Sequence, residues 1–434
     1  MFKYDFIILY EHRQRELENA VLLAMMLEKK GYKVAIEYRK SVRLLFIRGD
    51  VILAPFLYDN GCIKEFVLHP FSHCKKIINM QYEQVFLKKN EEVLGDLPSG
   101  CAKNAVHISW GKNTTERYEK IGIEPNHIFE IGHISIDLNM PKYRDVFLSR
   151  KDISKELNIP SNKKWLLFIS SFSCVGLTKT EYEKWKKLTV TVEPFTKISC
   201  DSQPLILDYY EELAKKHPEL IIIYRPHPHE DTCRRLKEIK TKYSNFKVIT
   251  SYSIRQWLIV SDYISTWCST SLVDILYAQK PCAIVRPIPF LEDYDYNIFR
   301  NQKVISKYQD LEAFIKNPDE LYHINPEPIS TYYCNTYKAE TFEKLRDICI
   351  HVKNSKEFEF DYFRNLHKSI LFLLKLYTYM ILLSFAEFID FSKITPEKYR
   401  ADVQYVHREM HNYKKEIAFY RKRFLGVLKN EKSQ

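Results

Sequence analysis

Short apolar runs alternate with amphipathic helical segments through most of the chain, and this alternation limits the fold more than any other feature. The apolar runs are typical of buried β-strands, while the segments between them carry apolar residues at helical spacing. Strands that alternate with helices in this way favour a parallel sheet covered on both faces. The strands expected in the first part of the chain lie in FIILY, YKVAIEY, DVILAPFLY, KKIINMQY, AVHISWG and HIFEIGH.

Proline and charged residues interrupt the alternation between residues 138 and 164, and it restarts at WLLFISS. The 434 residues exceed the usual size of one hydrophobic core, so two domains are expected. We predict an α/β fold with two Rossmann-like parallel-sheet domains facing a cleft, residues 1–140 and 161–330, joined by a linker at 141–160. Ligands of such sheets bind beyond the carboxyl ends of the strands.

The remaining residues predict a closing helix at 331–356 and a helical tail at 357–434. An apolar stretch at 370–391 begins the tail, but Lys375, Glu387 and Asp390 interrupt it. Each such charge costs about 2.5 to 3.5 kcal/mol at the centre of a bilayer. We therefore expect a buried or interfacial helix there rather than a membrane span.

The end of the tail carries apolar residues at heptad spacing and an excess of basic residues. This pattern fits a coiled-coil seam that joins copies of the chain, and it fits equally a helix docked on the body of the protein. The basic face of the helix suits a membrane surface in either case. The stripe consists of Val403, Val406, Met410, Tyr413, Ile417, Tyr420, Phe424 and Val427.

Charge and cysteine usage indicate the compartment and the kind of ligand. The formal net charge of +11 favours anionic ligands such as nucleotides or a membrane surface, and no nucleic-acid-binding motif is present. The ten cysteines are too widely spaced for zinc or redox motifs, as expected of free thiols in a reducing compartment. The N-terminus lacks the features of a signal peptide. We expect a cytoplasmic protein, peripheral on the inner face of the cytoplasmic membrane if its basic helix binds there.

Two polar segments follow strands of the second domain. In IIIYRPHPHE, residues 221–230, the side chains of Arg225, His227 and His229 leave a buried strand, and two prolines stiffen the loop. An arginine binds phosphate oxygens with a planar fork, and a histidine can donate a hydrogen bond or a proton to a leaving phosphate.

The second segment, in DYISTWCSTSLVDILYAQKP, places Ser269, Thr270 and Ser271 at the start of a helix expected to run from Ser269 to Gln279. Hydroxyl groups cap helices, and the free N–H groups of a helix N-terminus favour an anion. No glycine occurs between Gly176 and Gly426, so a glycine-rich phosphate loop is absent from this domain. The two segments together predict a phosphate site built from hydroxyl, imidazole and guanidinium groups.

RPHPHE and DYISTWCSTSLVDILYAQKP resemble the HP and serine-threonine motifs of GT-B transferases that build bacterial surface and capsular polysaccharides. That group includes Kdo transferases, polysialyltransferases and CDP-glycerol glycerophosphotransferases. YEHRQRELENAVLLAMMLEKKGYKV and IGHISIDL also resemble segments of this group, so the similarity spans residues 5 to 300. It implies a GT-B-like fold, no metal or other cofactor, and contacts from His227, Ser269 and Thr270 to a cytidine nucleotide.

The resemblance implies a glycosyltransferase that passes a sugar from a CMP- or CDP-linked donor to the hydroxyl of a glycan or lipid-linked acceptor. Glu11, His12 and Glu16, at the end of the first strand, are the candidates for the base that removes the acceptor's proton. Arg15 is the candidate for binding an anionic acceptor. Three alternatives stay open: a CDP-glycerol-type polyol-phosphate transferase, a UDP-GlcNAc 2-epimerase-like isomerase, and a non-catalytic scaffold.

Overall fold

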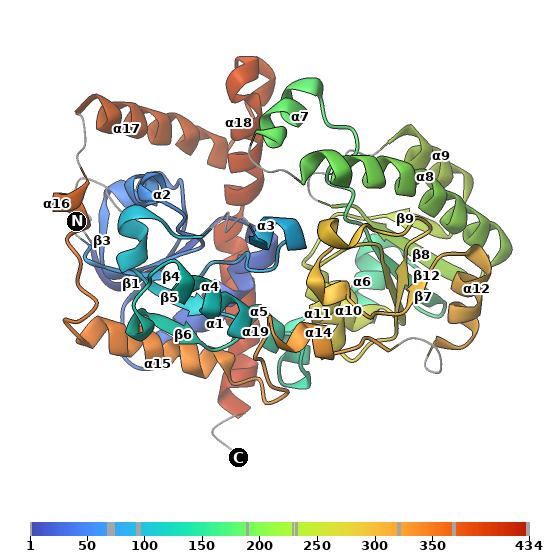
Figure 1. Cartoon of the computed structure of the whole chain (residues 1–434), viewed down its shortest axis with the longest axis horizontal. Coiled ribbons are helices and arrows are strands. Elements are labelled where there is room, and N and C mark those ends of the chain that lie inside the picture. Colours follow the sequence, from blue (N-terminus) through green and yellow to red (C-terminus); the bar gives the residue numbers. More distant parts are fainter. Residues whose placement is uncertain are drawn as a thin grey trace. The chain divides into compact units, whose positions relative to one another are not determined.

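The computed structural model describes residues 2–66, 74–92, 97–187, 191–227, 230, 233–318, 323–366 and 370–430 (Figure 1). The chain divides into two compact units, each built on one six-stranded sheet. Unit 1 comprises the described residues of 1–84, 96–137 and 333–434, and unit 2 those of 85–95 and 138–332.

The sheet of unit 1 is entirely parallel and has the strand order β2-β1-β3-β4-β5-β6. The chain therefore reverses its direction of travel across the sheet between β1 and β3, and the carboxyl ends of these two strands are the expected place for a ligand. The strands are β1 Phe2–Tyr10, β2 Val34–Tyr38, β3 Ile47–Ala54, β4 Lys76–Asn79, β5 Val106–Ser109 and β6 Ile128–Glu130.

The sheet of unit 2 is also parallel and has the order β12-β11-β10-β7-β8-β9. This is the strand order of dinucleotide-binding domains, with the reversal between β7 and β10. The strands are β7 Lys164–Ile169, β8 Leu220–Arg225, β9 Phe246–Val248, β10 Tyr263–Thr266, β11 Cys282–Val285 and β12 Val304–Ile305. Continuous runs such as Leu166–Phe168 are completely buried, because helices cover both faces of the sheet.

Helices flank both sheets and make up the C-terminal region, so the predicted α/β fold of two Rossmann-like sheets with a helical extension is confirmed. In unit 1 the α-helices are α1 Arg13–Glu28, α2 Asn60–Phe66, α4 Lys112–Lys120, α5 Ile134–Asp137, α15 Thr341–Asn354, α16 Tyr362–Asn365, α17 Ile370–Ser384, α18 Glu397–Met410 and α19 Tyr413–Asn430. In unit 2 they are α3 Lys88–Glu92, α6 Arg150–Leu157, α7 Lys179–Lys186, α8 Val192–Lys216, α9 Arg234–Lys242, α10 Ile254–Val260, α11 Leu272–Tyr277, α12 Tyr308–Lys316 and α14 Glu327–Ser330.

The C-terminal region packs onto unit 1. Its heptad stripe continues from α18 into α19, but the two helices are separate, because Asn412 has a φ of 61° and ends the helical path. Val406, Tyr413 and Phe424 of the stripe are buried, and α19 lies against α1, where Arg421 pairs with Glu28 at 2.6 Å. No helix in the described part of the chain is long and apolar enough to cross a membrane.

Candidate functional site

The carboxyl ends of β7, β8 and β10 lie in one row at the same edge of the unit 2 sheet. The register pairs Ile169 with both Arg225 and Thr266, so these three residues end their strands at the same level. His227 follows two positions after Arg225, and Ser269 three positions after Thr266. The structure therefore places both predicted donor segments at one edge, on strands separated by β7.

Glu230, a residue that the sequence pattern did not single out, holds the RPHPHE loop in place. Its carboxylate is buried and accepts hydrogen bonds from the backbone N–H of His227 (3.0 Å), the hydroxyls of Tyr224 (2.6 Å) and Ser170, and the side-chain amide of Gln203 (3.2 Å). Burial raises its pKa although these bonds oppose the shift. The loop that carries the half-buried His227 is thus fixed from inside the unit.

Arg225 supports the neighbouring loop. Its guanidinium donates to the backbone carbonyls of Ser251 (2.9 Å) and Tyr252, and burial lowers its pKa to about 10. These bonds tie the end of β8 to the segment that leads into α10. His229, the third residue predicted here, lies outside the described residues.

The hydroxyl cluster begins α11, which is shorter than the predicted helix. Ser271 is the N-cap residue and makes no side-chain capping bond, whereas Ser269 closes the turn before the helix: its hydroxyl accepts from the N–H of Ser271 (3.2 Å) and its carbonyl from the N–H of Leu272 (3.0 Å). Thr270 is exposed, and Ser269 and Ser271 are half-buried. The cluster thus combines one hydroxyl that is bonded within the turn before the helix with an exposed one beside it.

Ser170 and Ser171 add hydroxyls between the two predicted segments. They follow β7, at the point where the strand order reverses, and Ser170 binds Glu230 as described above. The hydroxyl of Ser171 and the indole N–H of Trp267 are buried without a hydrogen-bond partner among the described residues. Trp267 stacks on Phe172, with ring centroids 4.4 Å apart, beneath this edge. The sequence offered one indication of this position, because two serines directly follow the apolar strand WLLFI.

Replacing Glu230 with glutamine is expected to destabilise unit 2. The amide group of glutamine has only one acceptor oxygen, so the donors from Ser170, Tyr224 and His227 cannot all be satisfied. A buried donor left unpaired costs about 1 to 3 kcal/mol. Urea denaturation of Glu230→Gln should show this loss, whereas Glu238→Gln on the exposed side of α9 should not. Equal midpoints for Glu230→Gln and the wild type would contradict the role given to this network.

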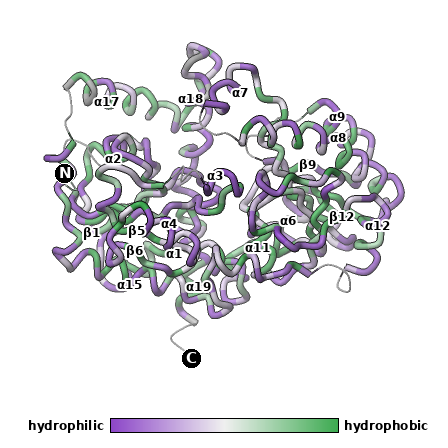
Figure 2. Tube along the Cα trace, viewed as in Figure 1, coloured by the Kyte–Doolittle hydropathy of each residue, from purple (hydrophilic) through white to green (hydrophobic). Residues whose placement is uncertain are grey.

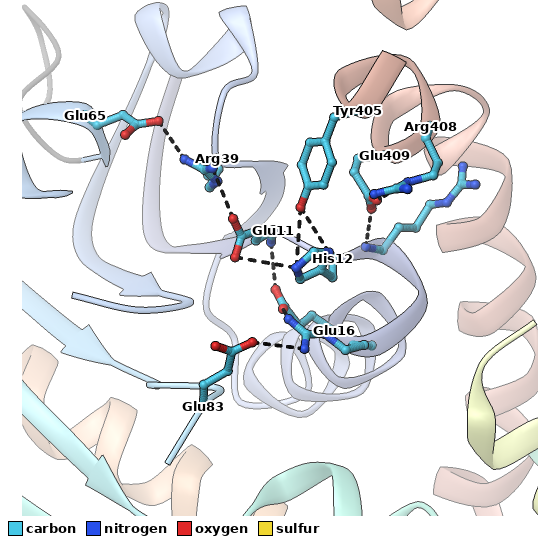
Figure 3. A network of polar contacts seen from close by, with 11 residues as sticks. Glu11, His12, Glu16, Arg39, Glu65, Glu83, Tyr405, Arg408 and Glu409 are labelled. Carbon is cyan, nitrogen blue, oxygen red and sulfur yellow. Dashed lines mark hydrogen bonds and ion pairs between the residues drawn. The ribbon is translucent and has the colours of Figure 1, made fainter. Parts of the chain in front are cut away.

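In unit 1, the end of β1 carries a cluster of paired charges (Figure 3). The carboxylate of Glu11 lies 3.1 Å from Arg39, which also binds Glu65 at 2.6 Å, and 3.8 Å from the imidazole of His12. Burial raises the pKa of Glu11. Glu11 and His12 lie where β1 and β3 mark the reversal of strand order, so the predicted residues lie at the edge where a ligand is expected for a sheet of this topology.

Glu16 points back toward the turn that precedes α1. Its carboxylate accepts the backbone N–H of Glu11 at 2.7 Å, and only 1% of the residue is exposed. Burial raises the pKa of Glu16 to about 8. Arg15, more exposed, pairs with Glu83 at 3.2 Å (Figure 3). Glu16 is therefore placed to orient the turn that carries Glu11 and His12.

Helix α18 contributes to the same cluster, which the sequence did not indicate. The hydroxyl of Tyr405 is hydrogen-bonded to Nδ1 of His12 at 3.0 Å, and Glu409 accepts the backbone N–H of Arg13 at 2.5 Å (Figure 3). Arg13 donates in turn to the carbonyl of His411. Tyr405 thus binds the imidazole of a residue almost four hundred positions earlier in the chain, and Glu409 and His411 hold the adjacent Arg13.

The segment IGHISIDL anchors α15. The carboxylate of Asp137 accepts the backbone N–H of Thr341 at 2.7 Å and its hydroxyl at 2.9 Å, and burial raises the pKa of Asp137 to about 6. The imidazole of His133 stacks on Trp110, with centroids 4.0 Å apart. IGHISIDL, one of the two segments of unit 1 that support the resemblance, therefore has a structural role in this chain.

No model of a known protein family matches the chain, and no curated protein sequence matches it. Many solved structures match the chain, among them the following two. One, a UDP-N-acetylglucosamine 2-epimerase, has a TM-score of 0.51 and 12% identity over 82% of this chain and 98% of its own. The other, the wall teichoic acid polymerase TagF, has a TM-score of 0.50 and 14% identity over 80% of this chain and 88% of its own. At such identities the likeness concerns the fold, and the chain has a GT-B-like fold of two Rossmann-like parallel sheets.

Proposed function

We propose that this protein is a metal-independent glycosyltransferase of cell-surface polysaccharide biosynthesis. It would transfer a sugar from a nucleotide donor, with a cytidine nucleotide expected, to a hydroxyl of a glycan or lipid-linked acceptor. One observation carries the proposal: the ends of β7, β8 and β10 bring Ser171, His227 and the 269–271 hydroxyls to one edge, at the reversal of strand order. The similarity of the HP and serine-threonine motifs supports the same assignment.

In the donor half, the phosphate of the nucleotide would lie against His227 and the hydroxyls of the 269–271 cluster. As the bond between sugar and phosphate breaks, negative charge grows on the leaving phosphate oxygen. An imidazole that donates a hydrogen bond or a proton there stabilises that charge, and the first turn of α11 adds the partial positive charge of its N–H groups. Arg225 would act indirectly, because its guanidinium supports the adjacent loop.

In the acceptor half, His12 is the base we favour. Its side chain is 21% exposed, whereas Glu16 is buried, so an acceptor hydroxyl can reach the imidazole more readily. Glu11 lies beside His12 and would stabilise the imidazolium that forms when the proton is taken. Glu16 would keep the turn in position, and Arg15 would bind an anionic group of the acceptor.

Nucleotide binding tests the donor half directly. The thermal unfolding temperature should rise with CMP or CDP more than with UDP or GDP, and cytidine without phosphate should give almost no shift. A ligand at about a hundred times its dissociation constant stabilises by roughly 2.7 kcal/mol, which corresponds to about 5 to 10 °C for a domain of this size. If none of the four nucleotides shifts the transition, the proposed donor site is wrong.

Turnover then separates the reaction classes. A UDP-GlcNAc 2-epimerase shares the fold, so epimerisation of UDP-GlcNAc without any acceptor would replace the transferase assignment with an isomerase. TagF also shares the fold, so polyol-phosphate transfer is a second alternative. Release of CMP from CDP-glycerol would identify that reaction. Binding of CMP without turnover of any donor would support a scaffold instead.

A further inference from the structure

Helix α17 has two apolar faces, of which only one is covered. The inner face packs into the core of unit 1 through Leu376, Tyr377 and Met380, beside residues of β1, β3 and α2. Leu383, on the same side, is also buried. This packing fixes the helix on the unit and leaves its opposite face toward solvent.

The outer face continues beyond the helix through the 3₁₀ turns Phe385–Glu387 and Ser392–Ile394. Eight of the eighteen exposed large hydrophobic residues in the described part of the chain lie within residues 371–394. Phe385, Phe388 and Ile389 are 61%, 70% and 68% exposed, and Figure 2 shows the hydrophobic residues of this region in green. We call the following set the α17 outer face: Leu371, Leu374, Ile381, Leu382, Phe385, Phe388, Ile389 and Ile394. Such a concentration of exposed apolar residues indicates a binding partner.

The length and position of α17 decide what that partner can be. The fifteen described residues of α17 extend about 22 Å, less than the hydrocarbon thickness of about 30 Å, and the inner face of the helix is occupied by protein. The apolar pattern covers only about two heptads before the path breaks into 3₁₀ turns, too short for a stable coiled coil with a second copy. A lipid surface that lies parallel to α17 requires neither a helix long enough to span the bilayer nor a second helix to pair with, so it fits this face.

Charge favours an anionic layer. Residues 361–434 contain fourteen Lys and Arg against eight Asp and Glu. In or beside the outer face the exposed cations Arg364, Lys375 and Lys393 outnumber the exposed carboxylates of Asp361 and Asp390. Basic side chains next to an apolar face bind anionic headgroups while the apolar residues enter the acyl boundary.

We propose that the α17 outer face docks the protein on the surface of an anionic lipid bilayer. Helix α17 also lies near the candidate acceptor cluster. The ammonium group of Lys40 lies over the ring of Tyr379, 5.6 Å from its centroid, and Arg39, the residue before Lys40, binds Glu11. If the proposed transferase function holds, this placement favours a lipid-linked acceptor over a free glycan.

Vesicle binding tests the docking surface without reference to activity. The full chain should co-sediment with vesicles of phosphatidylcholine mixed with phosphatidylglycerol, and less with phosphatidylcholine alone. Phe385→Asp/Phe388→Asp should lower the partition coefficient by about tenfold or more, because two exposed aromatic side chains lose their apolar burial. The matched control, Leu205→Asp/Leu291→Asp, changes two exposed leucines of unit 2 and should bind like the wild type.

The outcomes distinguish docking on lipid from self-association through the same face. Equal binding of the α17 variant and the wild type overturns the proposal, as does equal recovery on neutral and anionic vesicles. If the wild type forms a concentration-dependent dimer and does not bind vesicles, and the same variant is monomeric, the face would be assigned to contact with a second copy. Circular dichroism establishes that the variant is folded. Vesicle binding by a chain that turns over no donor would leave the docking intact and remove the proposed function.

Discussion

The His227→Ala protein should remain folded and should lose turnover of its nucleotide donor by a factor of about a hundred to a thousand. This is the range for removing one preorganised hydrogen-bond donor from charge that develops in a transition state. The side chain of His227 lies on a loop held by its backbone bond to Glu230, so its truncation to the β-carbon should leave the loop in place.

A histidine outside the site provides the control. His323 is exposed in the same unit, and His323→Ala should retain full turnover. Steady-state kinetics on the donor identified by the thermal shifts gives the comparison, with the thermal transition as the check on folding. Wild-type turnover by His227→Ala would refute the assignment of the donor half.

The fold could be predicted because its signals are local. Runs such as WLLFI and LIIIY are buried on both faces, and they alternate with helices at a spacing that only parallel sheets accommodate. The edge that carries Arg225, His227 and Ser269 could be predicted for the same reason, since parallel strands end at one edge. The order of the strands could not, and β7 lies between the two strands that supply the predicted segments.

The missing parts of the candidate site depend on contacts across long separations. Glu230 follows the histidines in sequence, but its role depends on Ser170 and Gln203, which reach it only in the folded unit. Tyr405 and Glu409 reach the end of β1 from the C-terminal region, and no spacing in the sequence relates them to His12. The sequence also does not show which of the candidate bases is exposed. Glu16 is buried and binds the backbone, whereas the side chain of His12 is partly exposed.

The pH dependence of stability should report on Glu16. Its folded-state pKa of about 8 lies above the ordinary value of 4.5, because burial disfavours the charged carboxylate. The folded chain therefore holds this proton at pH values where the unfolded chain has lost it. The contribution to stability is fully present below about pH 4.5, declines as the pH rises, and is lost above about pH 8.

Glu16→Gln removes this titration and keeps the size of the side chain. Between about pH 4.5 and 8, the free energy of unfolding of the wild type should fall relative to that of Glu16→Gln by up to about 1.4 kcal/mol per pH unit. Glu11 and Arg15 contact the side chain at position 16, and His12 lies beside Glu11, so their charges are present in both proteins and contribute to both curves. Glu119→Gln, on the exposed side of α4, removes one surface charge and should follow the wild type. Urea denaturation across this range measures the difference, and parallel curves for Glu16→Gln and the wild type would show that the carboxylate is ionised in the folded chain throughout.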